Sequence, residues 1–185
     1  RLERRLADQL GFQQALLDTL PYAVFYKGPD TRFLGCNRAY EQCFGVQRGD
    51  FIGKRVLDLE YLPPEDRAAY QAEDEATIAS VGLVRREMAI PFKDGKLHQT
   101  LYSVSGFRQL DGSPGGLIGV IVDITDLKQA QERFSLIFEM APECIYFIRT
   151  GDLILLDTNA AFEAVTGHRR EDAVGRPMPS LDLWE

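Results

Sequence analysis

Two stretches of this 185-residue chain repeat each other, and the repeat limits what the chain can fold into. Residues 37–53 and 159–175 are identical at seven of seventeen positions when they are aligned at a constant offset of 122. The identical pairs are Asn37/Asn159, Ala39/Ala161, Glu41/Glu163, Gly45/Gly167, Arg48/Arg170, Asp50/Asp172 and Gly53/Gly175. A period of this length is too long for a solenoid and indicates tandem domains of one family. Since the second copy stops before it matches all of the first, we expect one complete domain followed by part of a second.

The composition is that of an ordinary globular protein, with 45% hydrophobic and 26% charged residues. The formal net charge of -7 disfavours a broad nucleic-acid surface, so no nucleic acid is expected as a partner. No apolar run approaches the roughly 20 residues of a membrane span, and the charged residues 1–5 do not open a signal peptide. The three cysteines form no Cys-x-x-Cys pair, which favours a reducing compartment. We expect a cytoplasmic piece of a longer protein, with any membrane anchor upstream of it.

The sequence indicates neither metal binding nor catalysis. The two histidines, His98 and His168, are far apart and have no clustered partners, so no metal site is expected. The Gly-x-Ser-x-Gly, Walker A and His-Glu-x-x-His motifs are absent, so we expect no catalytic residues and no enzyme activity in this chain. Adjacent carboxylates such as Glu73 and Asp74 are interpreted as a solvated helix surface.

Two amphipathic helices are predicted, at 1–20 and at 126–141. In each of them seam positions recur at alternating spacings of three and four, which is typical of a coiled coil, and one position of the first seam is the polar Gln13. Burying such a seam between two copies is favourable, so we expect a parallel homodimer through these helices. The predicted seam consists of Leu6, Leu10, Leu17, Leu20, Leu127, Phe134 and Ile137.

Residues 21–125 are predicted to form one domain, and residues 142–185 the N-terminal half of a second. Asn37 is a good N-cap for a short helix, and Gly45 suits the left-handed residue that ends it. The predicted elements are strands at 22–26 and 32–35, helices at 37–44 and 63–81, and strands at 84–92, 96–107 and 117–123. This order indicates an α+β domain whose helices pack on one face of an antiparallel sheet.

Four motifs occur in an order that is typical of one family. They are the helix at 37–45, Ile52-Gly53-Lys54 after it, the Lys93-Asp94-Gly95 hairpin, and Asp123-Ile124-Thr125 before a charged amphipathic helix. Together they resemble the PAS family of sensory modules. The resemblance implies a five-stranded antiparallel sheet in the order 2-1-5-4-3, with helices on one face that enclose a pocket.

The resemblance also implies a function. PAS domains detect a small molecule, light or a redox state, or mediate dimerisation, and pass the signal through flanking helices to an effector domain. In bacteria this effector is usually a histidine kinase or a diguanylate cyclase. The alternative is a ligand-free dimerisation and interaction module. The residues to which the resemblance gives a structural or signalling role are Asn37, Gly45, Gly53, Asp123, Ile124 and Thr125.

The same resemblance restricts the ligand. Photoactive flavin members have a reactive cysteine where this chain has Val56, so no covalent flavin adduct can form. Residues 64–82 contain no histidine or cysteine, so no haem ligand is expected there. We expect a colourless protein without a bound cofactor, which holds either an unidentified small ligand or only a hydrophobic core. The predicted pocket lining is Phe25, Tyr40, Phe44, Val56, Tyr70, Ile78, Met88, Ile90, Leu101 and Ile121.

In the second copy, strands are expected around 144–147 and 153–157, followed by a helix at 159–167. So short a segment buries too little apolar surface to be stable alone. We therefore expect its apolar side chains to pack on another surface, either the first domain or a neighbouring chain. These residues are Ile145, Phe147, Ile154, Leu156 and Phe162.

Overall fold

The computed structural model describes residues 1–182 of the chain. They separate into two compact units, the first spanning Arg1–Thr125 and the second beginning at Asp126. No helix in the described part of the chain combines the length and the hydropathy that a membrane crossing requires.

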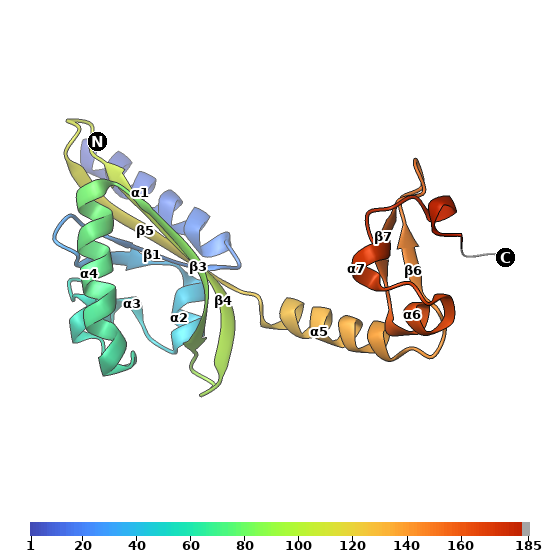
Figure 1. Cartoon of the computed structure of the whole chain (residues 1–185). Helices are drawn as coiled ribbons and strands as arrows, with labels where there is room; N and C mark the ends of the chain where they lie inside the picture. The colour runs from blue at the N-terminus through green and yellow to red at the C-terminus, as the bar shows by residue number, and fades with distance from the viewer. Residues whose placement is uncertain (183–185) are drawn as a thin grey trace. The chain divides into compact units, whose positions relative to one another are not determined.

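The first unit contains a five-stranded antiparallel sheet with the strand order β2-β1-β5-β4-β3 (Figure 1). The strands are β1 Ala23–Lys27, β2 Phe33–Cys36, β3 Leu83–Pro91, β4 Leu97–Arg108 and β5 Pro114–Asp123. β5 is central and pairs with both β1 and β4, as its run of apolar residues predicts. The predicted fold class and strand order are confirmed.

The two faces of this sheet carry different helices (Figure 1). The helices on the inner face are α2 Arg38–Phe44, α3 Arg48–Phe51, the 3₁₀ turn η1 Val56–Asp58, and α4 Pro64–Ser80. The hydrophobic core lies between them and the sheet. α1 Leu2–Thr19 lies over the outer face, where Leu17 lines a groove together with Val24 and Tyr26 of β1.

The alternation of side chains along β1 and β5 shapes the inner face. Phe25 is buried there, and Gly119 of β5 lies directly opposite it. A Cβ at position 119 would come within 2.1 Å of the Phe25 ring. The glycine therefore leaves the space in which this ring lies across the middle of the sheet.

The second unit repeats the opening part of the first. It begins with α5 Thr125–Met140, followed by β6 Tyr146–Ile148, β7 Leu155–Thr158, α6 Ala160–Thr166, α7 Arg170–Ala173 and the 3₁₀ turn η2 Met178–Leu181. β6 and β7 form a two-stranded antiparallel sheet. The core of this unit consists of Leu155, Phe162, Ala173 and Leu181.

One expectation about the second unit needs correction, that for Phe162, and the expected set also omits the buried Leu155. Leu156 is 49% exposed and Leu155 is fully buried, because a shift of one residue along a strand moves a side chain to the other face. Phe162 is buried by residues of its own unit and needs no other surface. Phe147 is 43% exposed, and its ring stacks on Phe138 of α5 with the centroids 5.5 Å apart.

Candidate functional site

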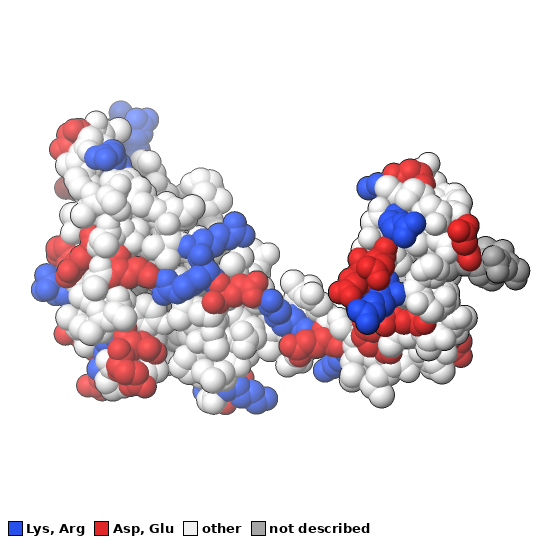
Figure 2. Space-filling model, in the orientation of Figure 1, with Lys and Arg blue, Asp and Glu red and all other residues white. Residues whose placement is uncertain are grey.

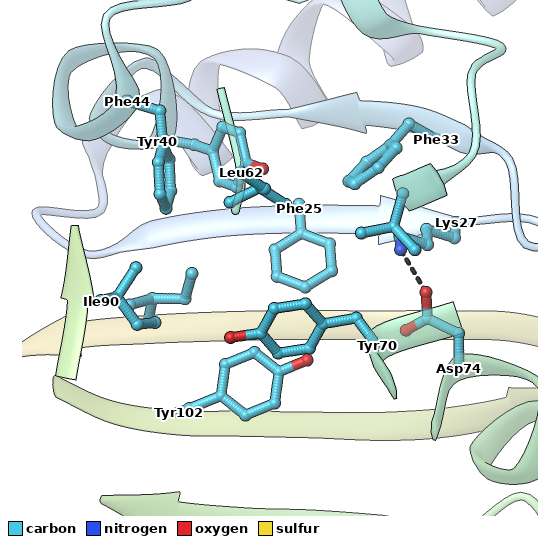
Figure 3. Close-up of a pocket in the computed structure, with 12 residues that line it drawn as sticks. Phe25, Lys27, Phe33, Tyr40, Phe44, Leu62, Tyr70, Asp74, Ile90 and Tyr102 are labelled. Carbon is cyan, nitrogen blue, oxygen red and sulfur yellow. Dashed lines mark hydrogen bonds and ion pairs between the residues drawn. The ribbon is translucent and has the colours of Figure 1, made fainter. Parts of the chain in front are cut away.

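A small cavity lies in the first unit between the inner face of the sheet and the helices (Figure 3). Its volume is about 40 Å³. Most of its walls are aromatic; the lining residues are Phe25, Lys27, Phe33, Tyr40, Phe44, Val56, Leu62, Tyr70, Asp74, Ile90, Tyr102 and Ile121. All five strands and the helices α2 and α4 contribute to this lining, so the sheet brings together residues that are distant in the sequence.

Most of the residues predicted to line a pocket do so: Phe25, Tyr40, Phe44, Val56, Tyr70, Ile90 and Ile121. Ile78 is buried in the core outside this lining, and Met88 packs against that core. The prediction for Leu101 is wrong. β4 buries Thr100, Tyr102 and Val104 on its inner face, so Leu101 belongs to the opposite face. Because side chains alternate along a strand, Tyr102 takes the place predicted for its neighbour.

Lys27 and Asp74 form an ion pair inside the cavity, and the sequence analysis missed it (Figure 3). Each side chain is only 2% exposed, so the interpretation of Asp74 as a solvated surface residue is wrong. Two patterns in the sequence could have revealed the pair. Alternation along β1 places Lys27 on the same face as Phe25, and Asp74 lies four residues after Tyr70 on one face of α4.

The pair lies in surroundings that disfavour charge. Burial lowers the pKa of Lys27 and raises that of Asp74, and attraction between the two groups only partly offsets this. The Lys27 ammonium also lies 4.2 Å from the centroid of the Phe33 ring, which is the geometry of a cation–π contact. The pocket therefore has one polar end, while the rest of its wall is apolar or aromatic.

Asn37 joins the wall of the pocket to α1. Its Oδ1 accepts hydrogen bonds from the backbone N–H of Tyr40 at 3.1 Å and of Val24 at 2.8 Å. Its Nδ2 donates to the backbone oxygens of Leu17 at 3.0 Å and Tyr22 at 2.8 Å. The predicted N-cap of α2 thus also ties the end of α1 to the start of β1.

An ion-pair cluster beside Asn37 holds α1 against α2 and α3. Nη2 of Arg48 donates to Glu41 at 2.7 Å and to Asp18 at 3.2 Å. Asp18, in the last turn of α1, also accepts the backbone N–H of Arg38 at 2.7 Å. The hydrogen bond from Arg48 lowers the pKa of Glu41 and so favours its charged form. We call Asp18, Glu41 and Arg48 the α1 clamp.

The two predicted motif glycines lie where the backbone turns. Gly45 has a φ of 67° and ends α2 as a left-handed cap, as predicted. Gly53 has a φ of 82°, and its N–H donates to the backbone oxygen of Phe33 at 2.7 Å. This hydrogen bond holds the segment after α3 against β2, next to the pocket.

The remaining motif residues lie at the junction of β5 and α5. Oδ1 of Asp123 accepts the backbone N–H of Thr125 at 2.9 Å and its hydroxyl at 2.6 Å. The N–H of Ile124 donates to the backbone oxygen of Gln99 in β4 at 2.8 Å. Oδ2 of Asp123 lies 2.7 Å from Nδ1 of His98. The first residue of α5 is thus fixed to the end of the sheet.

A comparison with known families identifies the family to which this fold belongs. A family model described as "PAS fold" matches residues 17–129, which is more than half of the chain. This chain belongs to the PAS family. The match includes the five strands, the pocket, the α2 helix and the Asp123-Ile124-Thr125 motif.

The relatives are sensor proteins. The chain is 30% identical over 130 residues to the virulence sensor protein BvgS of Bordetella pertussis, covering 68% of this chain and 10% of that protein. It is 29% identical over 126 residues to the aerobic respiration control sensor protein ArcB of Escherichia coli, covering 67% of this chain and 16% of that protein. The chain therefore spans a small part of each relative, and the match supports a PAS domain of a signalling protein.

Solved PAS structures have the same fold. The PAS domain of Bordetella pertussis BvgS aligns with a TM-score of 0.59 at 22% identity, covering 69% of this chain and 94% of that one. A structure described as VqmA bound to DPO aligns with a TM-score of 0.55 at 25% identity, covering 64% of this chain and 59% of that one.

Most residues of the predicted dimer seam are accessible in the single PAS chain. Leu17 is half-buried against the outer face of the sheet, where it lines the groove beneath α1. The exposed members are Leu6, Leu10, Leu20, Leu127, Phe134 and Ile137. Their exposure agrees with pairing between copies, which stays a prediction.

Two residues, Val56 and Cys36, bear on covalent attachment in the PAS pocket, whose expected absence stays a prediction. Val56, at the position compared with the reactive cysteine of flavin-binding members, lines the cavity. Cys36 is buried beside this region, and burial raises the pKa of its thiol to about 12, so it stays protonated at neutral pH. No group of three or more potential metal ligands gathers anywhere in residues 1–182.

Proposed function

We propose that the first unit is a sensory PAS domain that detects a cue in its pocket and transmits it through α1 and α5 to an effector. Sequence similarity to BvgS and ArcB favours a histidine kinase of a two-component system, and a diguanylate cyclase is the alternative. The active form would be a homodimer in the cytoplasm, paired through the flanking helices. In this proposal the chain contains no catalytic centre, binds no nucleic acid, haem or covalent flavin, and acts only on its effector.

The observation that carries the proposal is the set of hydrogen bonds made by Asn37. Tyr40, which lines the cavity, and Val24, next to the lining residue Phe25, both donate to Asn37. The same side chain donates to Leu17 at the end of α1. A displacement of the pocket wall therefore reaches α1 through a single buried residue, and the α1 clamp gives the movement a second route.

A similar path leads from the pocket to α5. Ile121 lines the cavity, and Asp123 lies two residues further along β5. Asp123 holds the first residue of α5 through the two hydrogen bonds from Thr125. A shift of β5 would therefore change the start of α5 directly.

The size of the cavity favours one specific alternative, a ligand-free relay and dimerisation module. A dry apolar cavity that binds benzene has a volume of about 150 Å³, whereas this one has about 40 Å³. A ring-sized ligand would therefore have to widen it. If the pocket never opens, the domain would act as a rigid connector between helices.

A pair of conservative substitutions tests the relay without any ligand. Val56 and Val104 are both buried in the core, but only Val56 lines the cavity. Val56→Ile adds one methylene group to the pocket, and Val104→Ile adds the same group elsewhere. We expect Val56→Ile to change amide hydrogen exchange at residues 17–20 and 124–128, and Val104→Ile to leave both segments unchanged. Equal exchange in both segments for the two folded variants would contradict the relay.

A further inference from the structure

The polar end of the pocket has hydrogen-bonding capacity that the protein does not use. A lysine ammonium has three N–H donors, and within residues 1–182 that of Lys27 makes one hydrogen bond, to Oδ2 of Asp74. Oδ1 of Asp74 accepts no hydrogen bond within the same residues. Two donors and one acceptor thus remain side by side at the cavity, in groups that are 2% exposed.

Tyr102 adds a further polar group at this end. Only 5% of this residue is exposed, and its hydroxyl takes part in no hydrogen bond within residues 1–182. Figure 3 shows its hydroxyl directed toward the end of the pocket that holds Lys27 and Asp74. Burial, followed by the nearby Asp74 carboxylate, raises the pKa of Tyr102, so it remains a neutral hydroxyl that can donate or accept.

The charges of Lys27 and Asp74 restrict the kind of small molecule that could bind at this end of the pocket. Lys27 and Asp74 already neutralise each other, so an anionic or a cationic ligand would leave one uncompensated charge in a buried site. A neutral molecule that presents one acceptor and one donor on the same edge can engage both residues without this penalty. The acceptor would take a hydrogen bond from the Lys27 ammonium, and the donor would give one to Oδ1 of Asp74.

The rest of the lining restricts the body of the molecule. Phe25, Tyr40, Phe44 and Tyr70 supply flat aromatic walls, which favour a planar ring. Leu62 and Tyr70 are only half-buried, whereas the other lining residues are buried. Movement of these two side chains is therefore the way to enlarge the cavity toward the size that a six-membered ring needs.

We infer that this pocket binds a small neutral planar molecule with an amide-like edge, of the cyclic amide class, whose edge lies against Lys27, Asp74 and Tyr102. This inference rests on the proposed sensory function and names the chemistry of its cue. Leu62 and Tyr70 form the mouth through which the molecule enters. Asp74 also connects the ligand to α4, because it is the residue of that helix that bonds across to β1.

The direct test is a titration of the whole chain with three ring-sized probes, followed by two-dimensional amide NMR. The probes are 2-pyridone, which is neutral and has the amide edge; benzoate, which is an anion; and toluene, which has no polar edge. We expect 2-pyridone to bind most tightly and to shift the amides of β1, α4 and β4. Tighter binding of toluene or benzoate, or no binding by any probe, would overturn the ligand class.

Two matched hydroxyl deletions sharpen this test. Tyr102→Phe removes the free hydroxyl at the polar end, and we expect it to weaken 2-pyridone binding about tenfold. Tyr40→Phe also removes a hydroxyl from a lining residue, but that hydroxyl is bonded to Tyr61 at 3.0 Å. We expect this control to leave the affinity within about twofold of the wild type. Equal losses in the two folded variants would contradict the assigned edge.

A charge variant tests the neutrality argument separately. Asp74→Asn keeps the shape of the side chain and leaves the Lys27 charge unbalanced, so we expect the preference to change from 2-pyridone to benzoate. An unchanged preference in the folded variant would overturn the argument from charge. The relay is tested independently by the Val56→Ile exchange experiment, which contains no ligand, so the two proposals can fail separately.

Discussion

Asn37 in the first unit and Asn159 in the second make corresponding hydrogen bonds, except that Asn37 also donates to Leu17 in its preceding helix. Oδ1 of Asn37 accepts the N–H groups of Tyr40 and of Val24, the second residue of β1. Oδ1 of Asn159 accepts those of Phe162 and of Ile145, the residue before β6. The side-chain amide of each donates to backbone oxygens between the preceding helix and that strand. The repeat in the sequence is therefore a repeat of the joint between a helix and the domain that follows it.

The α1 clamp is repeated as well. Arg170 donates to Glu139 at 2.6 Å, and its backbone N–H donates to Glu163 at 2.6 Å. Arg48 contacts Asp18 and Glu41 in the equivalent way. Glu139 lies in the last turn of α5, as Asp18 lies in the last turn of α1. α5 is thus attached to the second unit as α1 is attached to the first.

The two units differ at the place where the first has its polar pocket. Lys27 pairs with Phe33 across the first two strands, and Ile148 occupies the equivalent place opposite Leu155. The described part of the second unit has no counterpart of α4, so no residue like Asp74 faces this position. The shared motif specifies the helix joint, whereas a pocket also requires the later helix and strands.

The largest expected effect is the difference in stability between the units. The described core of the first contains fifteen buried residues and that of the second contains four, so the second buries far less apolar surface. We expect limited proteolysis to cleave within 126–182 at least about tenfold faster than within 22–125. Equal protection of both regions from hydrogen exchange, in protein shown by mass spectrometry to end at Glu185, would contradict this.

The next effect concerns the position at which Lys27 and Ile148 differ. Lys27→Met should destabilise the first unit by about 3–5 kcal/mol in urea denaturation, because it leaves Asp74 buried without a partner. Lys27→Met combined with Asp74→Leu should recover most of this loss, since no buried charge remains. Ile148→Met is the matched control, with an expected cost below about 1.5 kcal/mol. A double variant as unstable as the single one would show that the pair is not the cause.

The difference between local and distant contacts explains how far the sequence could predict this molecule. Asn37 and Gly45 act on backbone groups a few residues away, so residue type and spacing were sufficient to assign their roles. Lys27 and Asp74 are 47 residues apart, and their pairing requires the position of α4 over β1. The wrong choice of Leu101 instead of Tyr102 has a related cause, because the face of a strand depends on its register with its neighbours.

The same register problem affected the second unit. The expected apolar set contains Leu156 and omits Leu155, although the repeat aligns Leu155 with Phe33, a residue that is buried in the first unit. An alignment of the strands themselves, with the extra residue placed in the turn between β6 and β7, would have given the correct face. The expected strands of the first domain, in contrast, each lie within three residues of the observed ones at either end.

The repeated asparagines give a direct test of equivalence between the joints. Asn37→Ala and Asn159→Ala each remove a helix cap and leave buried backbone groups without partners, at an expected cost of about 2 kcal/mol in the unit concerned. Hydrogen exchange should show each loss in its own unit and the end of its preceding helix. If Asn159→Ala destabilised its unit far less than Asn37→Ala destabilised the first, the two joints would share their geometry but not their contribution to stability.

The two helices can also be compared as dimer seams. Leu10→Glu with Leu17→Glu in α1 should weaken self-association about tenfold in analytical ultracentrifugation, because charges replace apolar contacts. Phe134→Glu with Ile137→Glu makes the equivalent change in α5. Circular dichroism would verify that each variant is folded, since Leu17 also lines the groove between α1 and its own sheet. An unchanged association constant in both double variants would exclude the helices as the interface.

The smallest expected effect is a dependence of the first unit's stability on pH. Nε2 of His98 lies 3.0 Å from Oδ2 of Asp94, and its Nδ1 lies 2.7 Å from Oδ2 of Asp123. Asp123 has no counterpart in the described part of the second unit. Burial opposes the charge on His98, but hydrogen bonds to the two carboxylates outweigh it and raise its pKa above 6.5. A raised pKa means that the folded state binds the proton more tightly than the unfolded chain does. The contribution of His98 to the stability of the first unit is therefore complete below a pH of about 6.5, and it is lost as the pH rises through the pKa of His98 in the folded state.

Because both carboxylates are partly exposed, solvent screens the pair, and we expect a change of only about 1–2 °C in melting temperature between pH 6 and pH 8.5. His98→Gln keeps a hydrogen-bonding side chain without the titration, so its melting temperature should lose this component of the pH dependence. The stability of the second unit, followed by hydrogen exchange, should be the same in both proteins. If His98→Gln retained the full pH dependence of the wild type, another group would have to be responsible, and the β5–α5 junction would not respond to protonation.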